Sequence, residues 1–453
     1  MKKIILTALI LAALSIIITS CSDDNDDPQF SCFDGIQNGD ETGVDCGGSC
    51  TPCPTCDDGI QNGDETSVDC GGSCNPCQGR IEVSGMISSS TTWTSNNEYI
   101  LNGKVVVDAG VTLTIEEGTL IKGNKGTGSL ASALVVARGG TISAVGTAEK
   151  PIIFTSVDDN IEIGQKAGSN LSENDNALWG GVIILGKAKG SFKGDVNEVQ
   201  IEGIPAGDTW GLYGGDNNTD NSGVLKYVSI RHGGALIGEG NEINGLTLGA
   251  VGSGTVIENI EVVGNLDDGI EFFGGTVSPK NLLVWAQGDD GLDIDQSYSG
   301  TISNSMVILG ATSDHAMEID GPEGSYEAQF TLNNITLKGN GATPKGEYAD
   351  YRSNAIGTSN NIYAYGFKDD SDVELDNDGV ATNYNNGKLS FGTWQIVLPG
   401  GVDNVKDIFK NKSESVTVSG FGDNAEAVNE GSQTVGANTN DFNWTYAKSK
   451  GAF

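Results

Sequence analysis

Asp267-Asp268-Gly269-Ile270-Glu271-Phe272-Phe273 is the first of three related phrases in this chain. The second reads Asp289-Asp290-Gly291-Leu292-Asp293-Ile294-Asp295, and the third reads Asp314-His315-Ala316-Met317-Glu318-Ile319-Asp320. They start 22 and 25 residues apart, a repeat length typical of a solenoid in which each unit forms one coil. Apolar and acidic residues alternate within each phrase, which predicts a strand with one buried face. Strands of neighbouring coils lie about 4.8 Å apart, so we expect an outward column of Glu271, Asp293 and Glu318.

A series of asparagines supports this interpretation. Asn259, Asn281, Asn304, Asn334 and Asn361 lie 22, 23, 30 and 27 residues apart. Asparagine tolerates the left-handed backbone that a sharp corner needs, and its side chain can hydrogen-bond along a stack. Glycine supplies 66 of the 453 residues, which suits many tight corners, and no amphipathic helix is evident after the N-terminal segment.

These patterns predict an all-β fold over residues 80–453. We expect a right-handed, single-stranded parallel β-helix of roughly a dozen rungs. Earlier apolar stretches between glycine turns, such as Leu134-Val135-Val136, extend the pattern toward the N-terminus. A β-propeller is the alternative, but its repeats run to about 40 residues or more and fit the spacing poorly.

Residues 1–20 have the pattern of a secretory signal, because two lysines precede an apolar run that is short for a membrane span. Ile18-Thr19-Ser20-Cys21 resembles a bacterial lipobox, which implies cleavage before Cys21 and its acylation by lipid such as palmitate. An ordinary cleaved signal is the alternative. Residues 21–31 form an acidic linker, in which Ser22-Asp23-Asp24-Asn25-Asp26-Asp27 resembles the tag that routes lipoproteins to the outer face of the outer membrane in Bacteroidota. A merely solvated linker is the alternative.

Eight further cysteines form two small modules, residues 32–53 and 56–77, with one repeated spacing. They are Cys32, Cys46, Cys50, Cys53, Cys56, Cys70, Cys74 and Cys77. An even set at repeated spacing in an exported chain predicts disulfides, and the pairing within each module stays open. Zinc is the alternative, but no histidine accompanies the cysteines. Carboxylates in the module loops offer oxygen ligands for calcium, and the alternative is a polar loop that its disulfide bridges hold in place.

The chain is strongly acidic, with a formal net charge of −36. Nucleic acid is therefore not an expected partner, and a polyanionic ligand would be repelled unless metal ions bridged it. Arginine occurs only at positions 80, 138, 231 and 352, which argues against an arginine clamp for an anionic ligand.

The acidic phrases predict a bound cation. Like charges in one column repel, so a cation, a shared proton or a function must offset the repulsion. Hard cations prefer clusters of oxygen ligands, and we expect calcium here. The expected ligands are Asp268, Glu271, Asp293, Asp295, Asp314, Glu318 and Asp320. The alternatives are an ion that only joins rungs and a solvated acidic face.

Several phrases, as a set, resemble β-helical surface lipoproteins of Bacteroidota over residues 105–453. Among them are Trp179-Gly180-Gly181-Val182-Ile183-Ile184-Leu185-Gly186, Asn241-Glu242-Ile243-Asn244-Gly245-Leu246-Thr247-Leu248 and Phe442-Asn443-Trp444-Thr445-Tyr446-Ala447. The resemblance implies a pectin-lyase-like solenoid at the cell envelope. It implies little about function, because that family is largely uncharacterised.

The acidic phrases also resemble, more weakly, polygalacturonase-type glycoside hydrolases. Those enzymes place N-x-D, D-D and G-H-G on successive rungs and then R-x-K. Asn265-Leu266-Asp267 and Gly288-Asp289-Asp290 match the first two motifs, and Asp314-His315-Ala316 supplies the histidine without its glycines. The R-x-K is absent, since Tyr351-Arg352-Ser353 lacks the lysine.

That resemblance implies four candidate catalytic residues. Two carboxylates that flank a scissile bond can act as acid and base, and crowding raises the pKa of one of them. We expect Asp290 as the general acid, Asp267 and Asp289 as the base pair, and His315 as an orienting residue or only a hydrogen-bonded corner. A polysaccharide lyase is a further alternative, but it needs a basic proton acceptor beside the metal.

A second outward face is unusually apolar for a solenoid surface. By alternation it carries Val263, Trp285, Ile308, Tyr363 and Tyr365, among others. The C-terminal segment of the same chain, an outer-membrane receptor or a sugar would cover such a face. If the face is open, Trp285, Tyr363 and Tyr365 are the candidate residues for stacking on sugar rings.

Together these features predict a lipid-anchored protein on the cell exterior whose β-helix binds a polysaccharide with calcium in the acidic column. A glycoside hydrolase and a structural protein that docks to an outer-membrane receptor are the alternatives. Whether the protein is an enzyme stays open from the sequence.

Overall fold

A computed structural model describes residues 30–453, except 67, 76, 239–240 and 342–344. The chain divides into two compact units, residues 1–77 and 78–453. The predicted signal segment, Cys21 and nearly all of the acidic linker lie outside the described residues. Within the described part of the chain, no helix has the length and apolar character needed to cross a membrane.

Disulfides close both Cys-rich modules of the first unit. Each module pairs its first cysteine with its third and its second with its fourth, as Cys32–Cys50, Cys46–Cys53, Cys56–Cys74 and Cys70–Cys77. The loops are organised by carboxylates: Asp45 has a φ of 56°, and its side chain accepts the backbone N–H groups of Asp34 and Gly35. Asp69 does the same for Gly59 in the second module.

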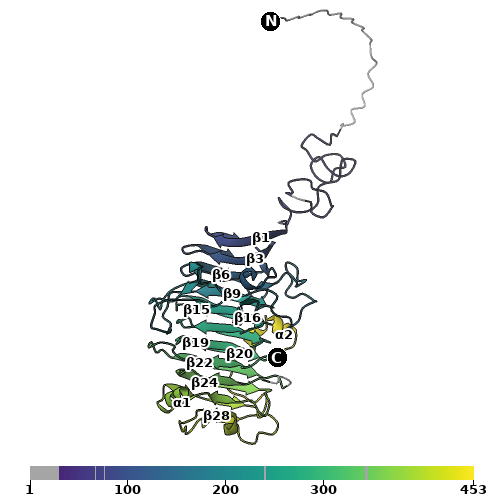
Figure 1. The fold of residues 1–453 in the computed structure, drawn as a ribbon. Helices are drawn as coiled ribbons and strands as arrows, with labels where there is room; N and C mark the ends of the chain where they lie inside the picture. Colours follow the sequence, from purple (N-terminus) through teal and green to yellow (C-terminus); the bar gives the residue numbers. More distant parts are fainter. Residues whose placement is uncertain (1–29, 67, 76, 239–240, 342–344) are drawn as a thin grey trace, which may run out of the picture. The chain divides into compact units, whose positions relative to one another are not determined.

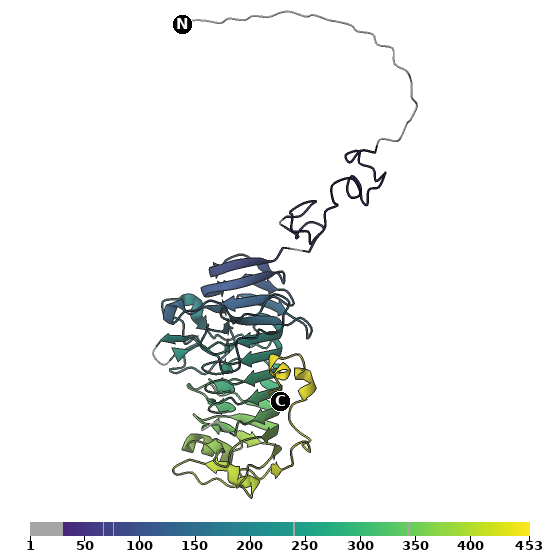
Figure 2. The same cartoon turned by 90° about the vertical axis from the view of Figure 1, so that its right-hand side faces the viewer.

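The second unit is a parallel β-helix, as its sequence repeats predict (Figure 1; Figure 2). Its strands lie in three stacks, and every pairing within these stacks is parallel. The first stack consists of β2 (Thr91–Trp93), β4 (Thr112–Ile115), β7 (Thr141–Val145), the N-terminal parts of β12 (Gly223–Arg231), β16 (Val256–Val263), β18 (Lys280–Trp285), β20 (Thr301–Ile308), β22 (Phe330–Lys338) and β24 (Gly357–Tyr365), and β26 (Leu389–Phe391).

The other two stacks share β1 and β3 at their beginning. The second stack consists of the N-terminal parts of β1 (Gly79–Ile87) and β3 (Asn97–Val107), then β5 (Leu120–Gly123), β8 (Ile152–Ser156), the C-terminal parts of β12, β16, β18, β20, β22 and β24, then β27 (Trp394–Ile396) and β29 (Ala425–Ala427). The third stack consists of the C-terminal parts of β1 and β3, then β6 (Ala133–Val136), β9 (Val182–Leu185), β15 (Leu246–Gly249), β17 (Ile270–Phe273), β19 (Leu292–Asp295), β21 (Met317–Ile319), β23 (Ala349–Tyr351), β25 (Val373–Leu375) and β28 (Phe409–Asn411).

Short elements decorate the stacks. They are the antiparallel pairs β10 (Val199–Gln200) with β11 (Leu212–Tyr213) and β13 (Leu236–Gly238) with β14 (Asn241–Glu242), the helices α1 (Asp378–Asn385) and α2 (Tyr446–Ser449), and the 3₁₀ turns η1 (Gly128–Leu130), η2 (Thr209–Gly211), η3 (Val405–Ile408) and η4 (Thr439–Phe442). No convincing amphipathic helix was expected after the signal segment, and the helices α1 and α2 have only eight and four residues. The sequence signal for the start of α1 is Asn377, whose side chain accepts the N–H groups of Gly379 and Val380 and caps the helix.

The predicted asparagine corners are confirmed. All five residues have φ between 47° and 59°, and they mark the corner between the first and second stacks. Asn281 donates a hydrogen bond to Asn259 at 2.9 Å, and Asn304 donates one to Asn281 at 2.6 Å. The asparagine side chains thus satisfy one another's hydrogen-bonding groups along the stack, while the backbone turns at each rung.

Apolar side chains from all three stacks fill the interior. In the third stack Phe272, Ile294, Ile319, Tyr351 and Leu375 point inward and are fully buried. The residues between them therefore point outward, which places the acidic phrases on the outer face of this stack. The C-terminal segment, yellow in Figure 1 and Figure 2, returns from the last rungs and places α2 beside the middle of the second stack.

Candidate functional site

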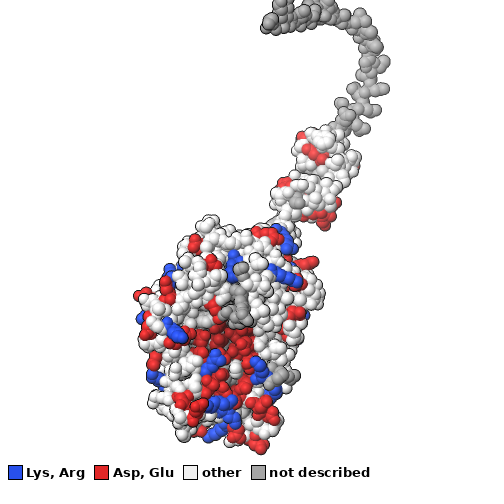
Figure 3. Space-filling view, in the orientation of Figure 1, with Lys and Arg blue, Asp and Glu red and all other residues white. Residues whose placement is uncertain are grey.

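The third stack carries a column of five carboxylates. Glu271, Asp293 and Glu318 are in register on β17, β19 and β21, as predicted. Asp350 on β23 and Glu374 on β25 continue the column, which the sequence analysis missed. Figure 3 shows Asp and Glu side chains gathered in a band down this face of the second unit. The alternation Ala349-Asp350-Tyr351 and Val373-Glu374-Leu375 is the signal that would have revealed the two further rungs.

The upper cluster of the column consists of Asp268, Glu271 and Asp293. Each offers a carboxylate oxygen within 4.8 Å of the others, and each is less than one-tenth exposed. Asn244 donates a hydrogen bond to Glu271, and the backbone N–H of Asp290 donates one to Asp268 at 2.9 Å. Oδ1 of Asp293 is buried and has no hydrogen-bond partner among the described residues.

Burial makes the charged form of the upper cluster unfavourable. Desolvation and the neighbouring carboxylates raise the pKa values of Asp268, Glu271 and Asp293 well above their usual range. No described lysine, arginine or histidine forms an ion pair with these three side chains. The cluster therefore holds protons or a cation from solution.

The middle cluster, Asp290, His315 and Glu318, is neutralised by the protein itself. Nδ1 of His315 lies 2.8 Å from Oδ1 of Asp290 and 3.8 Å from Oε2 of Glu318. Arg352 then binds Glu318 at 2.6 Å and Asp320 at 2.8 Å. Glu318 and Asp320, both expected as metal ligands, are thus paired with a guanidinium, which fills the place that the sequence assigned to a metal.

Two other predicted ligands lie beside the column. Asp314 is paired with Lys345 at 3.1 Å, so a lysine again neutralises the carboxylate. Asp295, in β19, is half-buried near Asp320 and Glu323, and desolvation together with these charges raises its pKa to about 7. Asp295 can therefore exchange its proton near neutral pH.

The lower cluster consists of Glu347, Asp372 and Glu374. Lys412 lies 3.1 Å from Asp372 and 2.5 Å from Glu374, so it too contains a protein cation. Burial and Asp372 raise the pKa of Glu347 to about 8. Of the three clusters, the upper one alone lacks an ion pair with a described basic residue.

The rim pair, Asp267 and Asp289, lies at the outer edge of the upper cluster. Their carboxylates and that of Asp268 approach within 4.8 Å of one another. Asp289 is exposed and Asp267 is half-buried, whereas Asp290 is buried. Burial of its carboxyl group and the nearby Asp290 raise the pKa of Asp289.

The structure brings the four candidate catalytic residues together but alters one expected role. Oδ1 of Asp290 accepts hydrogen bonds from the backbone N–H of His315 at 2.9 Å and from its ring at 2.8 Å. Oδ1 of Asp290 is thus engaged by His315, and the Asp290 side chain is buried. Asp289 is open to solvent and has a raised pKa, so it fits a general acid better than Asp290 does.

The apolar face of the second stack is covered by the chain's own C-terminal segment. Phe442, Tyr446 and Ala447 pack on a group of side chains made up of Val263, Leu283, Trp285, Ala286, Met306 and Ile308. Trp285 and Tyr363 are buried, and Tyr365 is half-buried. The expected stacking of Trp285 and Tyr363 on sugars is therefore corrected, because covered rings offer no face to a ligand.

Glu261 holds this segment in place. Its carboxylate accepts the backbone N–H groups of Tyr446 at 3.1 Å and Ala447 at 2.8 Å. The Arg231 guanidinium lies 4.5 Å from the centre of the Tyr446 ring and 3.9 Å from Glu261. Both charged side chains are almost fully buried.

A comparison with protein-family models agrees with this architecture. The family model described as a pectate-lyase-like β-helix domain matches residues 85–448. Among solved structures, the chain is similar to a pectin methylesterase from Aspergillus niger, with 11% identity and a TM-score of 0.30 over 79% of this chain and 88% of that chain. No curated protein matches the sequence.

Proposed function

This chain belongs to the family of pectate-lyase-like β-helix domains, and from that premise we propose that it is a cell-surface lipoprotein whose β-helix binds a glycan. The binding face is the upper cluster with the rim pair, and a calcium ion occupies the upper cluster. The observation that carries the proposal is Oδ1 of Asp293, which is buried and unpartnered among carboxylates within 4.8 Å.

The donor set of the upper cluster fits calcium. Asp268, Glu271 and Asp293 offer only oxygen ligands, and calcium prefers six to eight oxygens in flexible geometry. The middle and lower clusters already contain His315, Arg352 and Lys412. The three carboxylates of the upper cluster repel one another, and no ion pair between described residues reduces that repulsion. A bound cation would do so.

A glycan fits the surroundings of that ion. When bound, calcium would leave ligand positions for sugar hydroxyls, while the exposed Asp289 and the half-buried Asp267 accept hydrogen bonds from further hydroxyls. The net charge of −36 and the carboxylate band argue against a polyanionic ligand without bridging metal. An uncharged, hydroxyl-rich polymer therefore suits this face best.

The anchor is proposed from residues outside the described part of the chain. A lipid on Cys21 would hold the protein at the outer membrane, and the acidic stretch after it would direct the protein to the cell exterior. Metabolic labelling with a palmitate analogue tests the anchor, with Cys21→Ala as the negative control. Protease treatment of intact cells then tests exposure, and a wild-type protein that takes up no label would contradict this part of the proposal.

A retention assay on immobilised polysaccharides tests the binding function. The chain from residue 22 onward is applied in calcium and in EGTA, and we expect calcium-dependent retention by at least one polysaccharide. Asp268→Asn/Asp293→Asn should abolish retention. Asp57→Asn/Asp403→Asn removes the same number of charges at exposed sites outside the column and should not. Retention by no polysaccharide, or retention indifferent to EGTA and to the column variant, would contradict the function.

Hydrolysis of the bound glycan is the second candidate function. It is favoured by the rim pair, where the raised pKa of Asp289 suits proton donation and Asp267 lies close by. Reducing-end release from a retained polysaccharide measures this activity. Asp289→Asn should lower the rate about 100-fold or more while retention persists. Intact polysaccharide after prolonged incubation would leave glycan binding as the sole function.

A further inference from the structure

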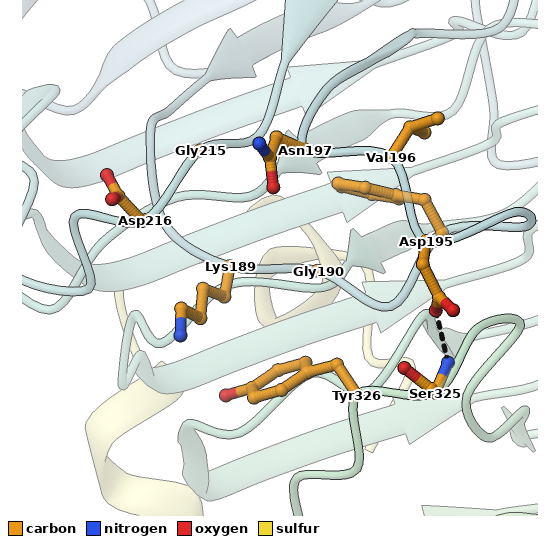
Figure 4. A pocket seen from close by; sticks show the side chains of 10 residues that line it. Lys189, Gly190, Asp195, Val196, Asn197, Gly215, Asp216, Ser325 and Tyr326 are labelled. Carbon is orange, nitrogen blue, oxygen red and sulfur yellow. Dashed lines mark hydrogen bonds between the residues drawn. The ribbon is translucent and has the colours of Figure 1, made fainter.

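A pocket of about 360 Å³ opens beside the column, between the loops that follow β9, β11 and β21 (Figure 4). Lys189, Asp195, Asn197, Asp216, Ser325 and Tyr326 line it. Lys189 and Asp216 come from one side, and Tyr326 lies across the opening from them. The Lys189 ammonium lies 5.5 Å from the centre of the Tyr326 ring.

The chain is fixed around this pocket by hydrogen bonds. Oδ1 of Asp195, at a φ of 53°, accepts the backbone N–H of Ser325 at 2.6 Å. The hydroxyl of Ser191 accepts the N–H of Gly324 at 3.0 Å, so a second bond ties the same two loops together. The pocket is therefore preformed, as small-ligand sites usually are.

The pocket adjoins the ends of the strands that carry the column. The N–H of Gly275, just after β17, donates to the carbonyl of Lys189 at 2.9 Å, and the N–H of Ser191 donates to the carbonyl of Gln296, just after β19, at 2.8 Å. Gln296 is three residues beyond Asp293, and three residues of strand span about 10 Å. A polymer laid along the strand direction from the upper cluster thus reaches the pocket.

The chemistry of the lining suits a sugar ring. Tyr326 is half-buried and offers an aromatic surface, while Lys189 and Asn197 donate and Asp216 and Asn197 accept hydrogen bonds. Two carboxylates, of Asp195 and Asp216, line the pocket together with one ammonium, so an added carboxylate on the ligand would raise the negative charge of the site. The balance of groups favours an uncharged ligand.

We infer that this pocket is a second glycan subsite and that it takes a neutral hexopyranose unit against Tyr326. This inference rests on the proposed function, because it names a further sugar of the polymer that binds at the column. The polymer would run along the strand direction, with one unit at the rim pair and another in the pocket.

Affinity for defined hexasaccharides tests the inference. The probes are β-1,4-linked glucose, mannose and xylose hexamers and an α-1,4-linked galacturonate hexamer, each titrated into the chain from residue 22 onward in calcium. We expect a hexose hexamer to bind more tightly than the galacturonate hexamer. Tyr326→Ala should weaken that binding about tenfold, and Tyr326→Phe, which keeps the ring, should weaken it far less.

A matched lysine pair serves as control. Lys189→Ala should weaken binding, whereas Lys193→Ala, on the same loop but outside the pocket, should not. If Asp268→Asn/Asp293→Asn abolishes binding while Tyr326→Ala and Lys189→Ala leave it unchanged, the subsite is wrong and the proposed function stands. Tighter binding of the galacturonate hexamer overturns the neutral-sugar assignment, and binding of none of the four hexamers counts against both.

Discussion

Nδ1 of His315 lies 2.8 Å from Oδ1 of Asp290, and the two residues come from neighbouring rungs of the third stack. Burial opposes the charge of the imidazole, but the hydrogen bond to Asp290 and the charges of Asp290 and Asp314 raise the pKa of His315 to about 10. At His232, burial instead lowers the pKa. Of the two histidines in the chain, His315 is therefore charged and His232 is neutral at neutral pH.

An NMR titration of the two imidazole rings tests this pair. We expect His315 to remain an imidazolium through pH 8 and His232 to be neutral at pH 7. Asp290→Asn should bring the pKa of His315 down by removing its partner, while His232 is unchanged and serves as the internal control. A His315 ring that titrates near its ordinary pKa of about 6.5 in the wild type would contradict the ion pair.

The same pair predicts a pH dependence of stability. The folded pKa of His315 is raised above its unfolded value, so the contribution is complete below about pH 6.5 and is lost as the pH rises toward 10. Urea unfolding of wild type and His315→Gln at several pH values measures it. The difference in unfolding free energy between the two proteins should shrink over this range. A constant difference would show that the ring contributes through packing alone.

Calcium should stabilise the protein more at pH 8 than at pH 5. Burial and like charges raise the pKa values of Asp268, Glu271 and Asp293 well above their usual range, so the stability that their protons provide is present in full below about pH 4 and is lost as the pH rises through the raised pKa values. Protons and calcium therefore compete for the same carboxylate oxygens of the upper cluster. Melting temperatures in calcium and in EGTA at both pH values measure the effect, and equal shifts at the two pH values would contradict the competition.

Replacing Glu261 should release the C-terminal segment. Glu261→Ala leaves Arg231 buried without its partner and two backbone N–H groups without their acceptor, at a cost of about 3–5 kcal/mol. Urea unfolding gives the stability, and trypsin cleavage at Lys448 and Lys450 reports release. Glu261→Gln keeps the shape and one acceptor, and should cost less. Unchanged stability and protease resistance in Glu261→Ala would show that apolar packing alone holds the segment.

The asparagine corners can be tested by separating backbone from side chain. Asn281 has a φ of 58° and bonds to the asparagines above and below it. Asn281→Gly keeps the left-handed backbone and loses the hydrogen bonds, whereas Asn281→Ala loses both and should be less stable by about a further 1–2 kcal/mol. Denaturant unfolding of the two variants measures this difference. A glycine variant no more stable than the alanine variant would contradict the need for a left-handed corner.

Much of the fold could be predicted from local patterns. Alternation such as that in Ile270-Glu271-Phe272 indicates a strand with one buried face, and the spacing of the asparagines gives the length of one coil. Successive coils stack in register because the backbones of their strands pair. The two carboxylates of the column after Glu318 were missed because a longer loop interrupts the repeat there. Asp350 follows Glu318 by 32 residues, rather than by 22 to 25.

The candidate site was only partly predictable, because its charge balance depends on residues distant in sequence. Arg352 pairs with Glu318 and Lys412 with Glu374, and nothing in the acidic phrases indicates these cations. The C-terminal segment likewise reaches Glu261 across about 185 residues. The pocket at Tyr326 was not predicted from the sequence either, since the loops that line it meet only in the folded chain.

Calorimetric titration of calcium at pH 7.5 into the chain from residue 22 onward tests the central claim most directly. We predict saturable binding to the wild type and to Asp57→Asn/Asp403→Asn, and its loss in Asp268→Asn/Asp293→Asn, in which circular dichroism confirms the β-helix. A wild type that binds no calcium, or a column variant that binds it as tightly as the wild type, would contradict a calcium site at Asp293.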